Sequence, residues 1–209
     1  MTVTSALLSF AVVAALMTLV PGVDTALILR SAVARSRAEA AVAALGICTG
    51  VLAWGVIAAA GASAVLAASQ LAYQILTYAG AAYLVFLGAQ MIYRSLRRKK
   101  VDAVQVPVAS SKWKAFGMGL TTNLLNPKIG VFYIAVIPQF TPSGANALLM
   151  GLALAAVHVL LTMLWAAVLI LGASLAGKWL RTEKGVTVMD RITGTVLIGF
   201  GVRVALNRP

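Results

Sequence analysis

Six long apolar runs, separated by short polar connections, are the feature that most constrains this chain. The runs cover residues 3–29, 40–67, 71–93, 115–138, 145–177 and 186–206. About 20 apolar residues are needed for an α-helix to cross the hydrocarbon core of a bilayer. Because backbone polar groups in lipid must be satisfied within the protein, a helix is the expected form of each run. The sequence therefore predicts an all-α integral membrane protein with six transmembrane helices.

The composition excludes an ordinary soluble domain. Hydrophobic residues make up 61% and charged residues 11% of the 209 positions, against about 45–50% and about 25% in soluble proteins. Six spans use nearly the whole chain, so we expect one transmembrane domain over 1–209. The first ten residues hold no Lys or Arg, so the first run is expected to stay as a helix rather than be cleaved as a signal peptide. The single cysteine, Cys48, excludes an internal disulfide.

The basic residues follow a membrane pattern. A formal net charge of +12 would suggest nucleic acid in a soluble chain. Here the first, third and fifth connections hold the Lys and Arg residues, apart from Lys128 inside the fourth run and Arg203 and Arg208 at the far end, whereas those around Ser69–Gln70 and 141–144 hold none. Basic connections stay on the cytoplasmic side. We therefore expect a lipid bilayer rather than nucleic acid as partner, with both termini outside.

Internal similarity divides the chain into two halves. A shift of 106 positions places Pro21 on Pro127, the two prolines that lie deep in apolar runs. Repeat 1 covers about 1–96 and repeat 2 about 115–209, and a flexible cytoplasmic loop at about 97–114 joins them. Because each half has three helices, the second half would insert upside down relative to the first. We expect two inverted three-helix repeats.

Each half begins with a run that contains a helix breaker beside polar groups. Pro21-Gly22 stands just before Asp24, and Pro127 stands between Asn126 and Lys128. Proline removes a backbone hydrogen bond and clashes with the preceding turn, and glycine adds backbone freedom. Inside a bilayer, broken backbone is tolerated only against protein or a watery cavity. We expect helices 1 and 4 to be broken at Pro21 and Pro127.

Asp24 and Lys128 are the ionisable residues that lie deepest in these runs. Each costs about 2.5–3.5 kcal/mol at a helix centre, and intramembrane charge usually marks a functional site. Both are expected to bind substrate or a proton, and Asp24 fits either a substrate ammonium or a proton. The structural alternatives are that Asp24 caps the restarted half-helix or pairs with Lys128, and that Lys128 snorkels to the surface.

Further candidates lie beside these two charges. Thr25, Asn123 and Asn126 are expected at the same site, with the alternative that the asparagines bond the carbonyls that Pro127 leaves free. His158, the single histidine, fits a proton relay, but a neutral histidine bonded to a neighbouring helix is favoured.

Small and aromatic residues inside the runs point mainly to packing. The Gly46-to-Gly50 spacing lets helices approach closely, so internal packing is its favoured meaning and a homodimer contact is the alternative. Trp54 and Trp165 lie well inside their runs and are expected in the core or in a pocket wall rather than in an interface belt.

These motifs resemble a known family. Pro21-Gly22-Val23-Asp24-Thr25, then Asn126-Pro127-Lys128 followed by Phe132-Tyr133, in six helices over 209 residues, resemble the LysE/RhtB family of bacterial amino-acid exporters. The first family signature usually reads Pro-Gly-Pro-Asp, so Val23 departs from it, while Asn-Pro-Lys matches. The resemblance implies export of an amino acid or close derivative across the bacterial inner membrane, driven by protons. It also implies the site residues, namely Pro21, Gly22, Asp24, Asn126, Pro127 and Lys128.

The main hypothesis is therefore a secondary transporter that exports a small zwitterion from between the broken helices. The alternative is a cation transporter of the wider exporter superfamily. Only Asp24 lies within the runs, with Asp190 at a helix edge, which is too few acids for a strong divalent site. No metal site or cofactor is expected. One histidine, one cysteine and no paired carboxylates argue against an enzyme, and a structural subunit would leave the charged breaks unexplained.

Overall fold

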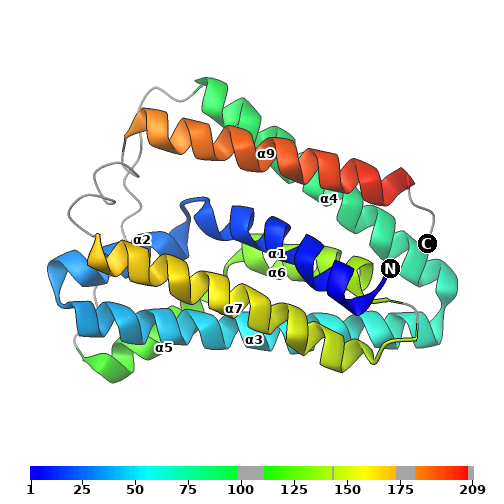
Figure 1. Ribbon diagram of the computed structural model, residues 1–209, viewed down its shortest axis with the longest axis horizontal. Coiled ribbons are helices and arrows are strands. Elements are labelled where there is room, and N and C mark those ends of the chain that lie inside the picture. Colours follow the sequence, from blue (N-terminus) through cyan, green and yellow to red (C-terminus); the bar gives the residue numbers. More distant parts are fainter. Residues whose placement is uncertain (98–110, 143, 173–181, 207–209) are drawn as a thin grey trace.

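The computed structural model describes residues 1–97, 111–142, 144–172 and 182–206, and all secondary structure in these residues is helical (Figure 1). The helices are α1 (Val3–Leu19), α2 (Val23–Ala34), α3 (Arg37–Ala68), α4 (Gln70–Arg97), α5 (Lys112–Leu124), α6 (Pro127–Val136), the 3-10 helix η1 (Ile137–Phe140), α7 (Ala147–Leu171) and α9 (Glu183–Leu206). The all-α prediction is confirmed for this part of the chain. Most of the predicted loop at 97–114 lies outside the described residues.

The two expected helix breaks are present. The axes of α1 and α2 differ by 56°, and α5 differs by 54° from the segment formed by α6 and η1. The residue before each proline, Val20 or Asn126, has extended backbone, with ψ of 119° and 105°. The proline ring disfavours the helical region for the preceding residue. Each run therefore forms two half-helices instead of one straight helix.

The length and hydropathy of the helices fit a membrane protein. Three helices, α3, α4 and α7, are each long and apolar enough to cross a bilayer, and the two bent pairs raise the number to five if each pair is one span. The sixth predicted run falls in α9, which is not among these helices. Within the described residues the structure thus supports three to five spans, and the six-span layout stays a prediction.

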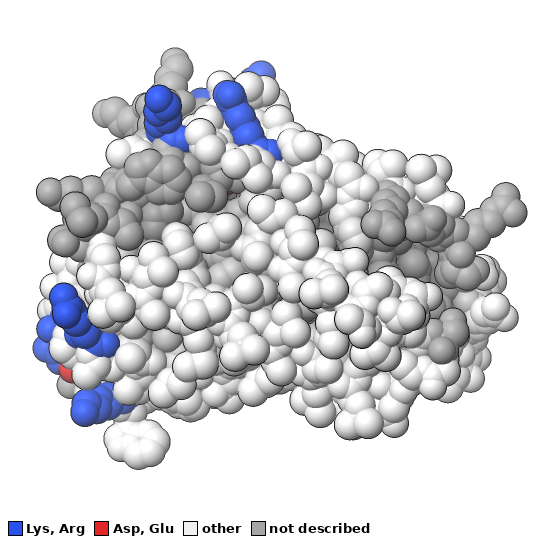
Figure 2. Space-filling view, viewed as in Figure 1, with Lys and Arg blue, Asp and Glu red and all other residues white. Residues whose placement is uncertain are grey.

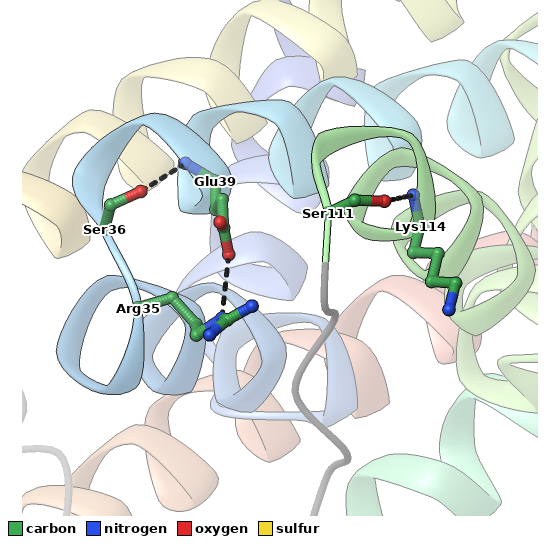
Figure 3. A network of polar contacts seen from close by, with 5 residues as sticks. All are labelled: Arg35, Ser36, Glu39, Ser111 and Lys114. Atoms are coloured by element: carbon green, nitrogen blue, oxygen red, sulfur yellow. Dashed lines mark hydrogen bonds and ion pairs between the residues drawn. The ribbon is translucent and has the colours of Figure 1, made fainter.

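Serine side chains set the start of two neighbouring helices. Ser36 Oγ accepts a hydrogen bond from the Glu39 backbone N–H at 3.1 Å, and Ser111 Oγ accepts one from the Lys114 N–H at 3.3 Å (Figure 3). Such N-caps satisfy amides that have no partner in the first helical turn. Arg35 also pairs with Glu39 at 3.4 Å. These caps fix where α3 and α5 begin, at the same end of the molecule.

The two ends of the molecule differ in charge. Visible Lys and Arg side chains gather at one end in Figure 2. This end includes the connections at 30–37 and 111–114, and we name it the basic end. The opposite end includes the connection at 68–70, the described residues between η1 and α7, the N-terminus and the C-terminal end of α9 (Figure 1), and we name it the neutral end. For the connections that the structure describes, the predicted separation of basic from neutral ones is therefore also a separation in space.

Glycines allow the longest helices to approach closely. A methyl group on Gly88 of α4 would lie 2.5 Å from the Gly194 carbonyl oxygen of α9, and one on Gly194 would lie 2.6 Å from the Gly88 oxygen. Gly55 of α3 and Gly151 of α7 show the same reciprocal relation, at 3.1 and 2.9 Å. Close backbone approach at small residues is the usual way in which membrane helices associate.

The Gly46-to-Gly50 motif packs inside the chain, as favoured from the sequence. Gly46 faces the backbone of α5, and a methyl group on Gly50 would lie 2.7 Å from Asn123 Oδ1. The motif therefore brings α3 against α5 and supports the position of Asn123.

Two separate apolar cores lie on either side of the helix breaks. The core toward the neutral end joins α1, α6, η1 and α7 with residues of α3, α4 and α9, and it contains the buried rings of Phe10, Phe132, Tyr133 and Phe140. The core toward the basic end joins α2, α5 and the adjoining parts of α3 and α7, and its fully buried members are all aliphatic. The layer of polar groups around the breaks lies between these two cores.

Candidate functional site

The first break exposes a backbone oxygen that a residue of the second break satisfies. In a continuous helix the Met17 carbonyl would accept from the N–H of residue 21, but Pro21 has none. Lys128 Nζ donates to Met17 O at 3.0 Å and to Val20 O at 3.4 Å. The Lys128 ammonium thus lies at the C-terminal end of α1, where the helix dipole favours a positive charge.

The second break satisfies its freed oxygen with neutral donors. Pro127 removes the donor for the Asn123 carbonyl in the same way. Trp54 Nε1 on α3 donates to Asn123 O at 3.4 Å, and the Asn126 backbone N–H donates to it at 3.1 Å. The equivalent carbonyls of the two breaks therefore have partners of different charge.

Asp24 connects the two breaks from the other side. Its Oδ2 accepts hydrogen bonds from Asn123 Nδ2 at 2.9 Å and from Asn126 Nδ2 at 3.4 Å. Asn126 also caps α6, because its Oδ1 accepts from the Lys128 backbone N–H at 3.1 Å. The alternative that the asparagine side chains bond the carbonyls freed by Pro127 is wrong, since both amides donate to Asp24.

The structure also decides against the structural alternatives for the two charges. Lys128 does not snorkel, because its ammonium donates to backbone oxygens inside the protein. Asp24 does not cap α2, since Gly22 is the N-cap and no side chain bonds there. In the described part of the chain, no ion pair within 4 Å joins Asp24 to Lys128. Each charge instead holds a neutral group of the opposite break.

A small cavity lies between the breaks. Its volume is about 40 Å³, and it is lined by residues from both breaks and from α3 and α7, among them Gly22, Asp24, Thr25, Asn123, Asn126 and Lys128. Three polar atoms of its walls are buried and have no hydrogen-bond partner in the described residues: Asp24 Oδ1, Asn123 Oδ1 and Trp165 Nε1. Residues that line this cavity therefore carry two acceptors and one donor without partners.

His158 lies in the wall of this cavity toward the neutral end. Its Nδ1 is 3.0 Å from the Tyr133 hydroxyl, and the two rings stack with centroids 5.7 Å apart. The hydrogen bond to a neighbouring helix favoured from the sequence is present. Phe10 and Phe132 meet the His158 ring edge-on at 6.4 and 6.1 Å.

Several contacts around the helix breaks are not predicted by the sequence. Trp54 was expected to be core or pocket wall, and its hydrogen bond to the freed Asn123 carbonyl has no signal in the sequence. Asp190 was placed at a helix edge, but it is buried within α9. One turn further, Thr193 donates to Leu16 O at 3.4 Å, so α9 also contacts the end of α1. Among the described residues, no three His, Cys, Asp or Glu side chains form a group that fits a metal.

A helical membrane protein in which two interrupted helices meet at buried charges has the organisation of a secondary transporter. The chain belongs to the LysE type translocator family, whose model matches residues 15–208. The resemblance seen in the two proline motifs is therefore confirmed. Members of this family are transporters, so the protein is a transporter and not an enzyme.

Relatives match over nearly their full length. The chain is 32% identical to the "Uncharacterized membrane protein YrhP" of Bacillus subtilis (strain 168), over 96% of this chain and 99% of that protein. It is 28% identical to a leucine efflux protein of Klebsiella pneumoniae (95% and 93%). It is 29% identical to the threonine efflux protein of Escherichia coli (strain K12) (90% and 91%). No solved structure gives a significant match.

Proposed function

We propose that this protein exports an amino acid or a close derivative from the cytoplasm across the bacterial inner membrane, coupled to protons. Its binding site is the cavity between the breaks, with Asp24, Lys128, Asn123, Asn126 and Thr25 as binding residues. The observation that carries the proposal is the set of unpartnered atoms on residues that line the cavity: two oxygen acceptors, on Asp24 and Asn123, and one N–H donor on Trp165.

The chemistry of these atoms suits a zwitterion. An ammonium group has three donors and no acceptor, so it can satisfy Asp24 Oδ1 and Asn123 Oδ1 together. A carboxylate only accepts, which suits the Trp165 N–H and the Lys128 ammonium. Buried acceptors without donors cost about 1–3 kcal/mol each, so binding would remove an existing penalty. We assign the substrate ammonium rather than the coupling proton to Asp24.

The substrate class follows from the remaining wall. Ile28, Ile47, Val51 and Ile129 provide an apolar lining, which suits an uncharged side chain. Two of the relatives are named leucine and threonine efflux proteins, and both of these amino acids have uncharged side chains. We propose a neutral amino acid.

The cavity is too small for an amino acid, so we infer that this structure is a closed conformation of the transporter. About 40 Å³ holds a few water molecules, since one water needs roughly 10–15 Å³ of such space. Sites for small organic ligands measure about 300–1,000 Å³. Binding therefore requires the half-helices to separate, as expected in alternating access.

We also propose the predicted layout of six spans in two inverted repeats, with the basic end in the cytoplasm and both termini outside. The similar bends of 56° and 54° support it, as do the reciprocal Gly55–Gly151 and Gly88–Gly194 contacts. A tag at either terminus should be accessible to protease in intact spheroplasts and protected in inverted vesicles.

An efflux assay tests the transport proposal. Cells or vesicles loaded with labelled leucine, threonine, lysine and glutamate should lose the neutral substrates faster when the parent protein is present. Asp24→Asn should abolish this efflux, while the control Glu39→Gln, which removes an acid at the basic end, should not. A parent protein that moves none of the panel contradicts the substrate proposal. Parent-like efflux by Asp24→Asn contradicts the site.

A second assay separates the two roles open to Asp24. If Asp24 binds the ammonium, Asp24→Asn loses both proton-driven efflux and the exchange of labelled for unlabelled substrate at equal concentrations. If Asp24 instead carries the coupling proton, the variant keeps exchange and loses only uphill efflux. If Asp24→Asn retains exchange, the role of Asp24 is therefore proton coupling and not substrate binding.

A further inference from the structure

A second and larger cavity lies at the neutral end. Its volume is about 490 Å³, within the range of about 300–1,000 Å³ found for small-molecule sites. The end of α3, the start of α4 and η1 with the segment after it form most of its wall, and single residues of α1, α7 and α9 complete it. We name it the outer pocket. It has the size for an amino acid that the inner cavity lacks.

The wall of the outer pocket is mostly apolar, and its polar side chains are uncharged. Among the described residues that line it, none has a charged side chain, and its polar groups include Ser63, Gln70, Gln74, Thr77 and Gln139. Gln139 Nε2 donates to Ala135 O at 2.9 Å, while its Oε1 is buried and has no hydrogen-bond partner among the described residues. These polar side chains can hydrogen-bond a passing solute, but they carry no charge that would pair with it. A zwitterion would therefore be held more weakly here than beside Asp24 and Lys128.

One layer of rings separates the outer pocket from the inner cavity. His158 lines the inner cavity, and Phe140 and Phe200 line the outer pocket. The Phe10 ring lies between them, 6.4 Å from the His158 ring and 5.5 Å from the Phe140 ring. Phe140 in turn stacks on Phe200 at 5.0 Å. Phe10 is completely buried and Phe140 is nearly so.

We propose that the outer pocket is an exit site for the substrate and that Phe10 and Phe140 form the gate between it and the inner cavity; this rests on the proposed export function. A dry apolar constriction blocks polar solutes until it widens. Phe10 is on α1 and Phe140 ends η1, so the gate belongs to the half-helices on the neutral-end side of the two breaks. Asp24 and Asn123 lie on α2 and α5, so these half-helices can separate while that pair stays together.

Cysteine accessibility tests this gate without any substrate. Cys48 is the single cysteine of the chain, so Cys48→Ala gives a thiol-free background. Thr77 lines the outer pocket and Thr162 lines the inner cavity, and they are buried to a similar extent, at 6% and 8% exposed. Thr77→Cys and Thr162→Cys are therefore a matched pair of reporters for a membrane-impermeant thiol reagent added to intact cells.

We expect rapid labelling of Thr77→Cys and protection of Thr162→Cys. Adding Phe10→Ala or Phe140→Ala should raise the labelling rate of Thr162→Cys by roughly tenfold or more, and the control Phe86→Ala, which truncates an exposed ring on α4, should not. If the alanine variants fail to fold, as judged by elution in detergent, Phe10→Leu keeps an apolar side chain and should still raise the rate.

Three results would overturn the proposal. The first is that Thr162→Cys is labelled as fast as Thr77→Cys while Phe10 and Phe140 are intact. The second is that Thr162→Cys stays protected in ring variants that fold. The third is that Thr77→Cys is labelled only in inverted vesicles. A failed efflux assay would instead count against the transported substrate and would leave the labelling pattern unchanged.

Discussion

The half-helices on the two sides of the breaks are held together by different chemistry. Toward the neutral end, α1 and α6 are joined by the Lys128 ammonium on the α1 carbonyls, inside a core rich in aromatic rings. Toward the basic end, α2 and α5 are joined by Asp24 and Asn123, beside an aliphatic core. The first contact satisfies backbone that proline leaves unpaired, while the second uses a carboxylate that a substrate ammonium can engage. We expect the first contact to contribute more to stability and the second to be more sensitive to substrate.

The largest effect is expected at Lys128. Lys128→Met leaves the Met17 and Val20 carbonyls without this donor, and an unsatisfied buried acceptor costs about 1–3 kcal/mol. The variant should unfold at a lower temperature in detergent than the parent, and it should lose efflux. Lys114→Met removes an exposed lysine from α5 (Figure 3) and should match the parent. If Lys128→Met melts like the parent, Lys128 does not hold α1 to α6.

The next effect is expected at the asparagines, and it should differ between them. Asn123→Leu removes the shorter bond to Asp24, and hydrogen bonds to charged groups contribute about 1.5–3 kcal/mol, so efflux should fall roughly tenfold or more. Asn126→Leu removes the longer bond and also the cap of α6, and loss of a cap costs about 0.5–2 kcal/mol. We therefore expect Asn123→Leu to act mainly on transport and Asn126→Leu mainly on melting temperature. The reverse order would contradict the assigned roles.

A smaller effect is expected from crowding Asn123 without removing it. Gly50→Ala would place a methyl group 2.7 Å from Asn123 Oδ1, which shifts the amide that bonds Asp24. Efflux should fall by a factor of a few while the protein still folds. Gly61→Ala on the same helix meets nothing within 4 Å and is the matched control. Equal efflux by the two variants would show that the position of Asn123 is not critical.

The smallest effect is expected at Trp54. Trp54→Phe removes a hydrogen bond of 3.4 Å to the Asn123 carbonyl, but the Asn126 backbone N–H still bonds the same oxygen. Hydrogen bonds between membrane helices average about 0.6 kcal/mol, so melting temperature should change little. A loss as large as that of Lys128→Met would mean that the two breaks are equally dependent on their donors.

The sequence predicted the helices and the breaks because both depend on local chemistry. Apolar runs set the helices, and each proline disturbs its own turn. The cost of burying charge also led to the prediction that Asp24 and Lys128 lie at one site. The partners of these charges were not predictable, because they depend on which faces of separate helices meet. Lys128 reaches the α1 carbonyls only because α6 crosses α1 at that depth, and hydropathy contains no information on that crossing.

The burial of Asp190 was likewise not predictable from the sequence. Its neighbour Arg191 and the basic residues before it resemble a helix end in the sequence. The structure begins α9 at Glu183, so Asp190 lies about two turns inside the helix and is buried. A charge near a polar connection is therefore a poor guide to burial when the helix start is displaced by several residues.

The reciprocal contact between Gly88 and Gly194 has a consequence for the surrounding lipid. At this crossing the two helix backbones meet directly, with the side chains of Ile92 and Ile198 packed beside them, so α4 and α9 have little freedom to slide past each other. Movement of the gate must then take place mainly in α1, α6 and η1. The lipids beside α4 and α9 would face a nearly constant wall through a transport cycle, so bilayer thickness and lateral pressure should affect the gating step little from that side.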